Sequence, residues 1–183
     1  EKRRRVQGDD HPSTLSSLNN LASLYLRQGR LNEAQPLLLE AMEKRRRALG
    51  DDHPDTLISL NNLAGLYLHQ GRFDEAEPLY LEALEKQRRV TGDGHPYTIS
   101  VLGNLAFLYM RQGRLQDAEP LFIETLENQR RILGDDHPDT HRSVNNLANL
   151  YMDQGRYAQA EPLFLDALKK KRSTLGDDHT FTH

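Results

Sequence analysis

Acidic residues and a histidine recur as short clusters along the chain, and both residue types can ligate metal ions. Asp-Asp-His occurs four times, at residues 9–11, 51–53, 135–137 and 177–179. Side chains of consecutive residues rarely converge on one ion, and a fifth copy, Asp93-Gly94-His95, breaks the set. We therefore predict that these clusters cap helix N-termini, where acidic groups interact favourably with the helix dipole, and that they bind no metal.

Other possible metal-binding or catalytic motifs in the sequence are incomplete. His137 and His141 lie four residues apart, a spacing that can bind zinc on a helix, but no third ligand accompanies them and a surface histidine pair is the simpler interpretation. The chain has no Gly-rich phosphate loop, nucleophile elbow or isolated acid pair. Candidate residues recur with the repeat described below, which is typical of an architectural role. We predict that the protein is not an enzyme and uses no cofactor.

Basic residues gather in four runs near the expected ends of helices: Lys44–Arg47, Arg88–Arg89, Arg130–Arg131 and Lys169–Arg172. Cations there interact favourably with the helix dipole, and each run lies beside an acidic connector. Nucleic-acid-binding proteins usually carry an excess of positive charge, whereas this chain has a net charge of −3 and an isoelectric point near 6.3. We predict a locally balanced surface that binds neither nucleic acid nor membrane; the alternative is a patch for nucleic acid or an acidic membrane.

The amino-acid composition excludes several classes of protein. With 28% charged and 37% hydrophobic residues among 183, the chain is too apolar for a disordered tail and lean for a compact core. Cysteine is absent, so disulfides, thiolate zinc sites and cysteine nucleophiles are excluded. Apolar runs are too short to cross a membrane, and no signal peptide is apparent. We expect a cytoplasmic protein.

An internal repeat of 42 residues organises the whole sequence. Gly-Asp-X-His begins at Gly8, Gly50, Gly92, Gly134 and Gly176. The spacing predicts one repeat array over residues 1–183, with full repeats at 8–49, 50–91, 92–133 and 134–175. Residues 1–7 match the end of a preceding repeat and residues 176–183 the start of a fifth, so we expect a piece of a longer array.

Each repeat is predicted to form two helices. In residues 50–91, the segment from Gly50 to Pro54 combines a helix stop with a helix start. Apolar residues then recur at three- and four-residue spacing on both sides of Gln70-Gly71-Arg72, whose short turn favours antiparallel neighbours. Ala64 and Ala76 lie where the two helices must approach closely.

These residues resemble the tetratricopeptide repeat. The family pattern is matched by Leu60, Leu63-Ala64, Tyr67, Gly71, Phe73, Ala76, Tyr80 and Ala83. The period departs from the usual length of about 34, because the second helix is extended and Arg88 stands where the family has proline. This longer form, with His-Pro-Asp, Leu-Asn-Asn-Leu-Ala and Gln-Gly-Arg, is similar to the repeats of kinesin light chains. The resemblance implies an all-α, right-handed superhelical solenoid of antiparallel helix pairs with the first helices lining the inner face.

Residues four apart, most of them polar, run along the first helices, opposite the apolar face. They are Asn19, Ser23 and Arg27; Asn61, Gly65 and His69; Gly103, Phe107 and Arg111; and Asn145, Asn149 and Asp153. Asparagine amides can pair with an extended peptide backbone. The resemblance implies that the asparagines hold a peptide in a concave groove, with Arg27 and Arg111 facing peptide acids. Gly103 beside Phe107 could form an apolar pocket.

Two interpretations of these asparagines remain open, because the same side chains could instead hydrogen-bond between neighbouring helices. At the level of function, the leading hypothesis is a protein-interaction scaffold that binds a protein or peptide ligand in the groove. The alternative is a structural spacer or an array that self-associates into a homo-oligomer through the stacking surfaces of its terminal repeats.

Overall fold

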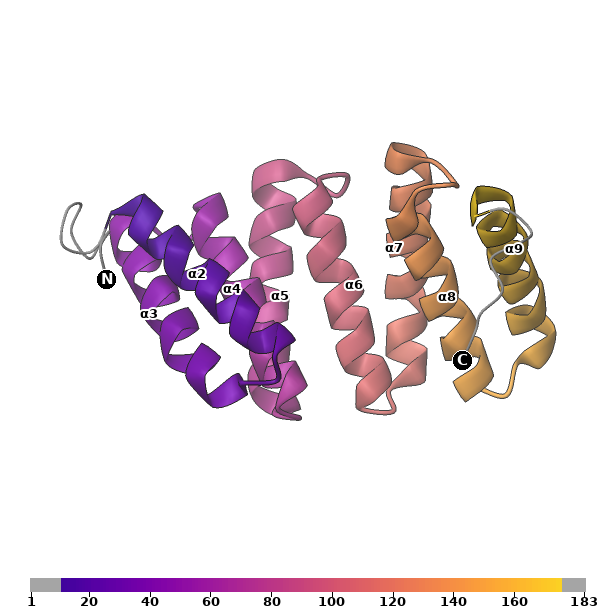
Figure 1. Cartoon of the computed structure of the whole chain (residues 1–183), viewed down its shortest axis with the longest axis horizontal. Coiled ribbons are helices and arrows are strands. Elements are labelled where there is room, and N and C mark those ends of the chain that lie inside the picture. The colour runs from indigo at the N-terminus through magenta and orange to yellow at the C-terminus, as the bar shows by residue number, and fades with distance from the viewer. Residues whose placement is uncertain (1–10, 176–183) are drawn as a thin grey trace. The chain divides into compact units, whose positions relative to one another are not determined.

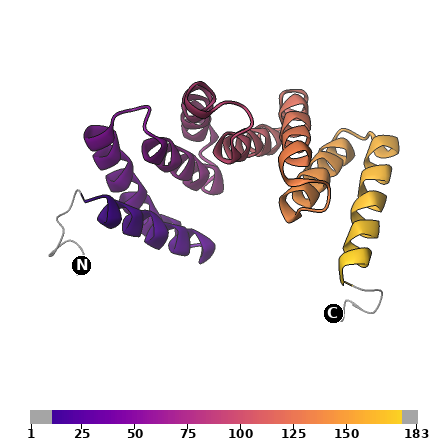
Figure 2. The same ribbon diagram turned by 90° about the horizontal axis from the view of Figure 1, so that it is seen from above.

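The computed structural model describes the backbone of residues 11–175, which form eight helices and no strand, and the side chains up to Lys169 (Figures 1 and 2). The first helices of the pairs are α2 (Pro12–Arg27), α4 (Pro54–His69), α6 (Pro96–Arg111) and α8 (Pro138–Asp153). The second helices are α3 (Leu31–Leu49), α5 (Phe73–Thr91), α7 (Leu115–Leu133) and α9 (Tyr157–Leu175). The predicted flanking fragments 1–7 and 176–183, Asp9–Asp10, Asp177–His179 and the side chains of residues 170–172 lie outside the described residues.

Helices that follow one another in the sequence pack together within each of two compact units, as the sequence predicts. Within one compact unit, which ends at Leu108, α2 packs on α3, α3 on α4 and α4 on α5, and α2 also touches α4 directly. A second unit begins at Tyr109, where α7 packs on α8 and α8 on α9. The helix starts recur every 42 residues, from Pro12 to Pro138 and from Leu31 to Tyr157, which confirms the all-α array of helix pairs.

Glycine sets the turn within each pair. After α4 the backbone of Gly71 adopts a φ of 74°, a left-handed conformation that favours glycine. The amide of Arg72 then donates to the Tyr67 carbonyl at 2.9 Å, which closes the helix end. The connector between pairs is closed differently: Thr56 donates from Oγ1 to the Gly50 carbonyl at 2.9 Å. Both turns are short, so successive helices must run antiparallel.

Small residues allow close helix packing inside a pair. Ala64 and Ala76 are completely buried, as expected from the sequence, and Tyr80 fills the space beside them with 1% of its surface exposed. A Cβ added at Gly65 would lie 3.5 Å from the Tyr80 hydroxyl, so α4 and α5 also approach closely there. The apolar face of each helix is thereby used within its own pair and against the next pair.

Arginines at the starts of α5 and α9 each join three parts of the array. The Arg72 guanidinium lies 4.2 Å from the centroid of the Tyr67 ring and pairs with Glu75 at 2.6 Å. Its Nη1 also donates to Gln35 of α3, in the preceding pair, at 3.2 Å. In the second unit Arg156 stacks on Tyr151 in the same way. The turn of one pair is therefore tied to the second helix of the pair before it.

In the second unit this link is an ion pair. Arg156 Nη1 donates to Glu119 Oε2 of α7 at 2.5 Å, and Gln154 Nε2 donates to the same oxygen at 3.1 Å. These hydrogen bonds, that of Arg156 above all, lower the pKa of the Glu119 carboxyl below its ordinary value.

Histidine caps the first helices. His53 Nδ1 accepts a hydrogen bond from the Asp55 amide at 3.1 Å, and the equivalent contacts are made by His11, His95 and His137. Of the acidic residues predicted to cap, those in the connectors instead pair with the basic runs: Asp51 with Arg46, Asp52 with Arg89, Asp93 with Arg88 and Asp135 with Arg130. The sequence placed the caps correctly in these clusters, but the imidazole accepts the helix amide.

Removing one cap tests this assignment. His53→Ala leaves the Asp55 amide without its acceptor and is expected to lower the free energy of unfolding by about 1 kcal/mol. His53→Asn, whose side-chain oxygen can accept the same bond, is expected to recover most of that loss. Chemical denaturation followed by circular dichroism measures both; equal stability of His53→Ala and the parent would refute a capping role.

The Glu119 link predicts a pH dependence. A carboxyl whose pKa is lower in the folded state stabilises that state above its unfolded pKa, and the contribution is lost as the pH falls through the folded value. Glu119→Gln should therefore have a lower thermal midpoint than the parent at neutral pH, and the difference should shrink well below pH 4.5, the ordinary carboxyl pKa. A difference that stays constant from neutral to acid pH would contradict this account.

Candidate functional site

Two of the asparagines predicted to line a groove bridge neighbouring first helices. Asn19 of α2 is buried, with 6% exposed, and donates from Nδ2 to Ser59 Oγ of α4 at 3.3 Å. Asn61 of α4 is half-buried, and its Oδ1 accepts from Asn104 Nδ2 of α6 at 3.0 Å. The structure thus brings both side chains to the contacts between first helices, in line with the alternative interpretation, and their role toward a ligand stays a prediction.

The other predicted site residues differ in exposure. Asn145, Asn149 and Asp153 on α8 are exposed, as are Arg27, His69 and Arg111 at the ends of their helices. Ser23, Gly65, Gly103 and Phe107 are half-buried. Their participation in ligand binding, including the apolar pocket suggested for Gly103 and Phe107, likewise stays a prediction.

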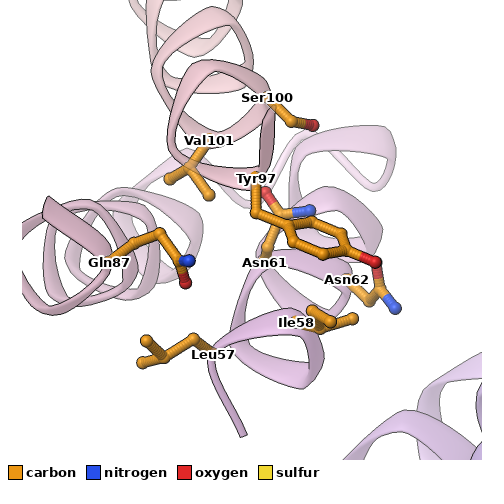
Figure 3. A pocket seen from close by; sticks show the side chains of 8 residues that line it. All are labelled: Leu57, Ile58, Asn61, Asn62, Gln87, Tyr97, Ser100 and Val101. Atoms are coloured by element: carbon orange, nitrogen blue, oxygen red, sulfur yellow. The ribbon is translucent and has the colours of Figure 1, made fainter. Parts of the chain in front are cut away.

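A pocket of about 190 Å³ lies between α4, α5 and α6 (Figure 3). The first helix α4 contributes Leu57, Ile58, Asn61 and Asn62. The second helix α5 contributes Gln87, and the next first helix, α6, contributes Tyr97, Ser100 and Val101. Aliphatic walls therefore meet amide and hydroxyl groups, and none of the eight lining residues carries a formal charge.

Sequence reasoning found one of these residues, Asn61, and missed the rest of the pocket. A signal was available, because several lining positions break the repeat, Tyr97 and Gln87 among them. Tyr97 stands where the His-Pro-Asp motif has Asp55 and Asp139, and Gln87 stands where the first repeat has Arg45. Departures from a repeat mark positions that the shared architecture does not fix, and such positions are free to serve a particular ligand.

The equivalent place one repeat earlier is occupied by the chain itself. Arg45 of α3 has 4% of its surface exposed, and its Nη1 donates to the Asp55 carbonyl and to Ser59 Oγ, both at 3.0 Å. Its Nη2 donates to Ser16 Oγ of α2 at 3.2 Å. Burial lowers the pKa of this guanidinium, and the charge of Asp55 opposes that shift. The buried cation is thus held by oxygen acceptors on two helices.

The described residues show neither a cluster of metal-ligand side chains nor a membrane-spanning helix. Among the described residues, no three histidine or acidic side chains are placed to share an ion. His137 instead caps α8, with its Nδ1 3.8 Å from Asp139 Oδ2, and His141 Nε2 is buried without a hydrogen-bond partner in the described part of the chain. None of the described helices combines the length and hydropathy of a membrane span.

Comparison with solved structures gives relatives of the same architecture. A single-substitution variant of a kinesin light chain with nearly identical TPR-like repeats, from Podosopora anserina, is 28% identical, with a TM-score of 0.77 over 94% of this chain and 82% of that one. Another structure of those repeats is 27% identical, with a TM-score of 0.74 over 96% and 83%. BtubC (BKLC) from P. vanneervenii shares the fold, at 24% identity and a TM-score of 0.78 over 93% and 67%.

Comparison with family models covers nearly the whole sequence. The model of the tetratricopeptide repeat matches residues 1–43, 13–89, 59–109 and 97–173. No curated protein matches the chain. Tetratricopeptide repeats generally mediate protein–protein interaction, and proteins of this kind are generally non-catalytic scaffolds. The chain belongs to the tetratricopeptide repeat family, as an array of the kinesin light chain-like type.

Proposed function

We propose that the protein is a non-catalytic scaffold that binds a short, extended peptide segment of a partner protein along its first helices. The observation that carries this proposal is the pocket between α4, α5 and α6, with the amides of Asn61 and Asn62 among its lining groups. A peptide needs both backbone hydrogen-bond partners and a place for a side chain, and this site offers both. We include in the proposal that residues 1–183 act as a single cytoplasmic array without cofactor or nucleic acid.

The amide of Asn61 can serve the helix contact and a ligand together. Its Oδ1 accepts from Asn104, and its Nδ2 carries two further donors that can pair with peptide carbonyl groups. Asn145 and Asn149 on α8 are exposed and present complete amides. Arg27 and Arg111 are exposed cations at the ends of α2 and α6, which suits a peptide with acidic residues.

The test separates binding from packing. Peptides selected from a random phage-displayed library against the parent chain are measured by fluorescence polarisation against single variants. Asn61→Ala and Asn145→Ala are each expected to weaken binding by about fivefold, the effect of losing about 1 kcal/mol of hydrogen bonding.

Asn104→Ala is the matched control, since it breaks the same Asn61–Asn104 bond and leaves the Asn61 side chain in place. If it weakens binding as much as Asn61→Ala, the asparagine acts through packing alone. Unchanged binding in both Asn61→Ala and Asn145→Ala would overturn the proposed groove.

Self-association is the second candidate, and exposed apolar side chains on the first and last described helices favour it. Leu24 on α2 is 49% exposed, and on α9 Tyr157 is 69% and Leu165 58% exposed. Apolar groups presented together mark a surface that a protein neighbour can cover.

Light scattering over a wide range of concentrations tests this candidate. The molar mass is expected to rise with concentration in the parent and to rise less in Leu165→Glu, which places a charge on the exposed face of α9. A strict monomer at all concentrations would remove self-association.

A further inference from the structure

We propose that the repeat position held by Arg45 in α3 and by Gln87 in α5 decides which contact between helix pairs admits a ligand side chain. Arg45 closes its site, whereas Gln87 leaves open a pocket that accepts an uncharged aliphatic side chain of the bound peptide. This inference rests on the proposed function and adds to it the register and the chemistry of one subsite.

The two sites correspond residue by residue at the 42-residue offset. Leu57, Asn61 and Gln87 of the open pocket correspond to Leu15, Asn19 and Arg45 of the earlier site. The helices at the two sites are equivalent, because α2, α3 and α4 repeat as α4, α5 and α6 with identical lengths. We therefore attribute the difference between a filled site and an open one to side chains.

Side-chain reach accounts for the filling. The Arg45 guanidinium extends from α3 to Ser16 of α2 and to Asp55 and Ser59 of α4, so it occupies the junction of the three helices. Gln87 has only 1% of its surface exposed, and its Nε2 donates to Thr91 Oγ1 of its own helix at 2.9 Å. The shorter side chain is thus held on α5, and it lines the pocket together with the side chains drawn in Figure 3.

The residues that line the open pocket also differ from those around Arg45. The hydroxyls that hold Arg45, those of Ser16 and Ser59, correspond to Ile58 and Val101 in the pocket. An arginine or lysine from a ligand would therefore lose the acceptors that Arg45 finds. A carboxylate would meet no cation, since no lining residue is charged. Burial of either ion without a partner is unfavourable, so the pocket selects an uncharged group, and the side chains of Leu57, Ile58 and Val101 favour an aliphatic one.

The closed site is stable for an electrostatic reason. A guanidinium buried without acceptors would be strongly unfavourable, but here two hydroxyls and a carbonyl accept hydrogen bonds from its Nη1 and Nη2 groups. The Ser59 hydroxyl is in turn held by a bond to the Asp55 carbonyl at 3.2 Å and accepts from Asn19. This network keeps Arg45 in place, so a ligand side chain cannot easily displace it.

A small probe tests the open pocket directly. N-acetyl-L-leucinamide is titrated into the methyl-labelled chain at concentrations up to the tens of millimolar, and the NMR signals of Leu57, Ile58 and Val101 are followed. Saturable shifts are expected in the parent and an apparent Kd at least tenfold higher in Gln87→Arg, whose new side chain fills the space. N-acetyl-L-aspartate, which is charged, should give no saturable shift at these methyl groups. Arg89→Gln, an exposed charge change on the same helix, should bind like the parent.

The reciprocal variant keeps the test decisive even if Gln87→Arg does not fold. Arg45→Gln combined with Ser16→Ile, Ser59→Val and Asp55→Tyr gives the earlier site the residues found at Gln87, Ile58, Val101 and Tyr97 of the open pocket. Saturable shifts at the Leu15 methyl groups, absent in the parent, are expected. The absence of such shifts, of shifts in the parent pocket, or of any effect of a folded Gln87→Arg would overturn the inference.

The two proposals fail in different ways. Binding of N-acetyl-L-leucinamide at Ile58 and Val101 without any peptide selected from the library would overturn the proposed function and leave the assignment of the open pocket standing. Selected peptides that depend on Asn61 but bind equally well to parent and Gln87→Arg would overturn the role of the Arg45 and Gln87 position alone.

Discussion

A single helix pair of this chain cannot bury its apolar faces by itself, and the rest of the structure depends on that constraint. In the first unit, Leu15 and Leu18 of α2 and Ala41 of α3 form a buried cluster, with Leu37 packed against it. The next pair completes the burial, because α4 packs on α3 and also touches α2. Stacking is therefore required for stability, and the contacts between pairs become the places where side chains must be matched.

Polar groups at the contacts between helix pairs require specific partners on the neighbouring helices. An amide or guanidinium taken from water must find hydrogen-bond partners, and here the partners lie on adjacent helices: Ser59 for Asn19, Asn61 for Asn104, and Ser16 for Arg45. The same requirement makes these positions sensitive to substitution. A polar side chain that bridges two first helices is part of their contact, so one substitution there changes how the helices pack.

Comparison of the repeats also distinguishes positions that build the shared fold from positions that vary. The histidine cap and the arginine stacked on tyrosine recur at the repeat interval, so they belong to the shared framework. By contrast, the position of Arg45 reads Gln87, Gln129 and Lys171 in the later repeats, and Tyr97 replaces an aspartate. A framework that already satisfies its own caps and turns leaves such positions open to vary, and the pocket between α4, α5 and α6 is built where two of them meet.

The helix pairs, their period and the buried alanines could be predicted from the residues alone, because they follow from local rules: apolar spacing, a glycine turn and the space that Ala64 and Ala76 leave. The motifs also indicated a protein-interaction repeat. The bonds of Asn19 and Asn61 to neighbouring helices, and the different roles of Arg45 and Gln87, became visible only in the folded chain. Hydrogen bonds and cavities between helix pairs form where side chains about forty residues apart in the sequence come into contact. The spacing of apolar residues along one helix does not predict which of these side chains meet.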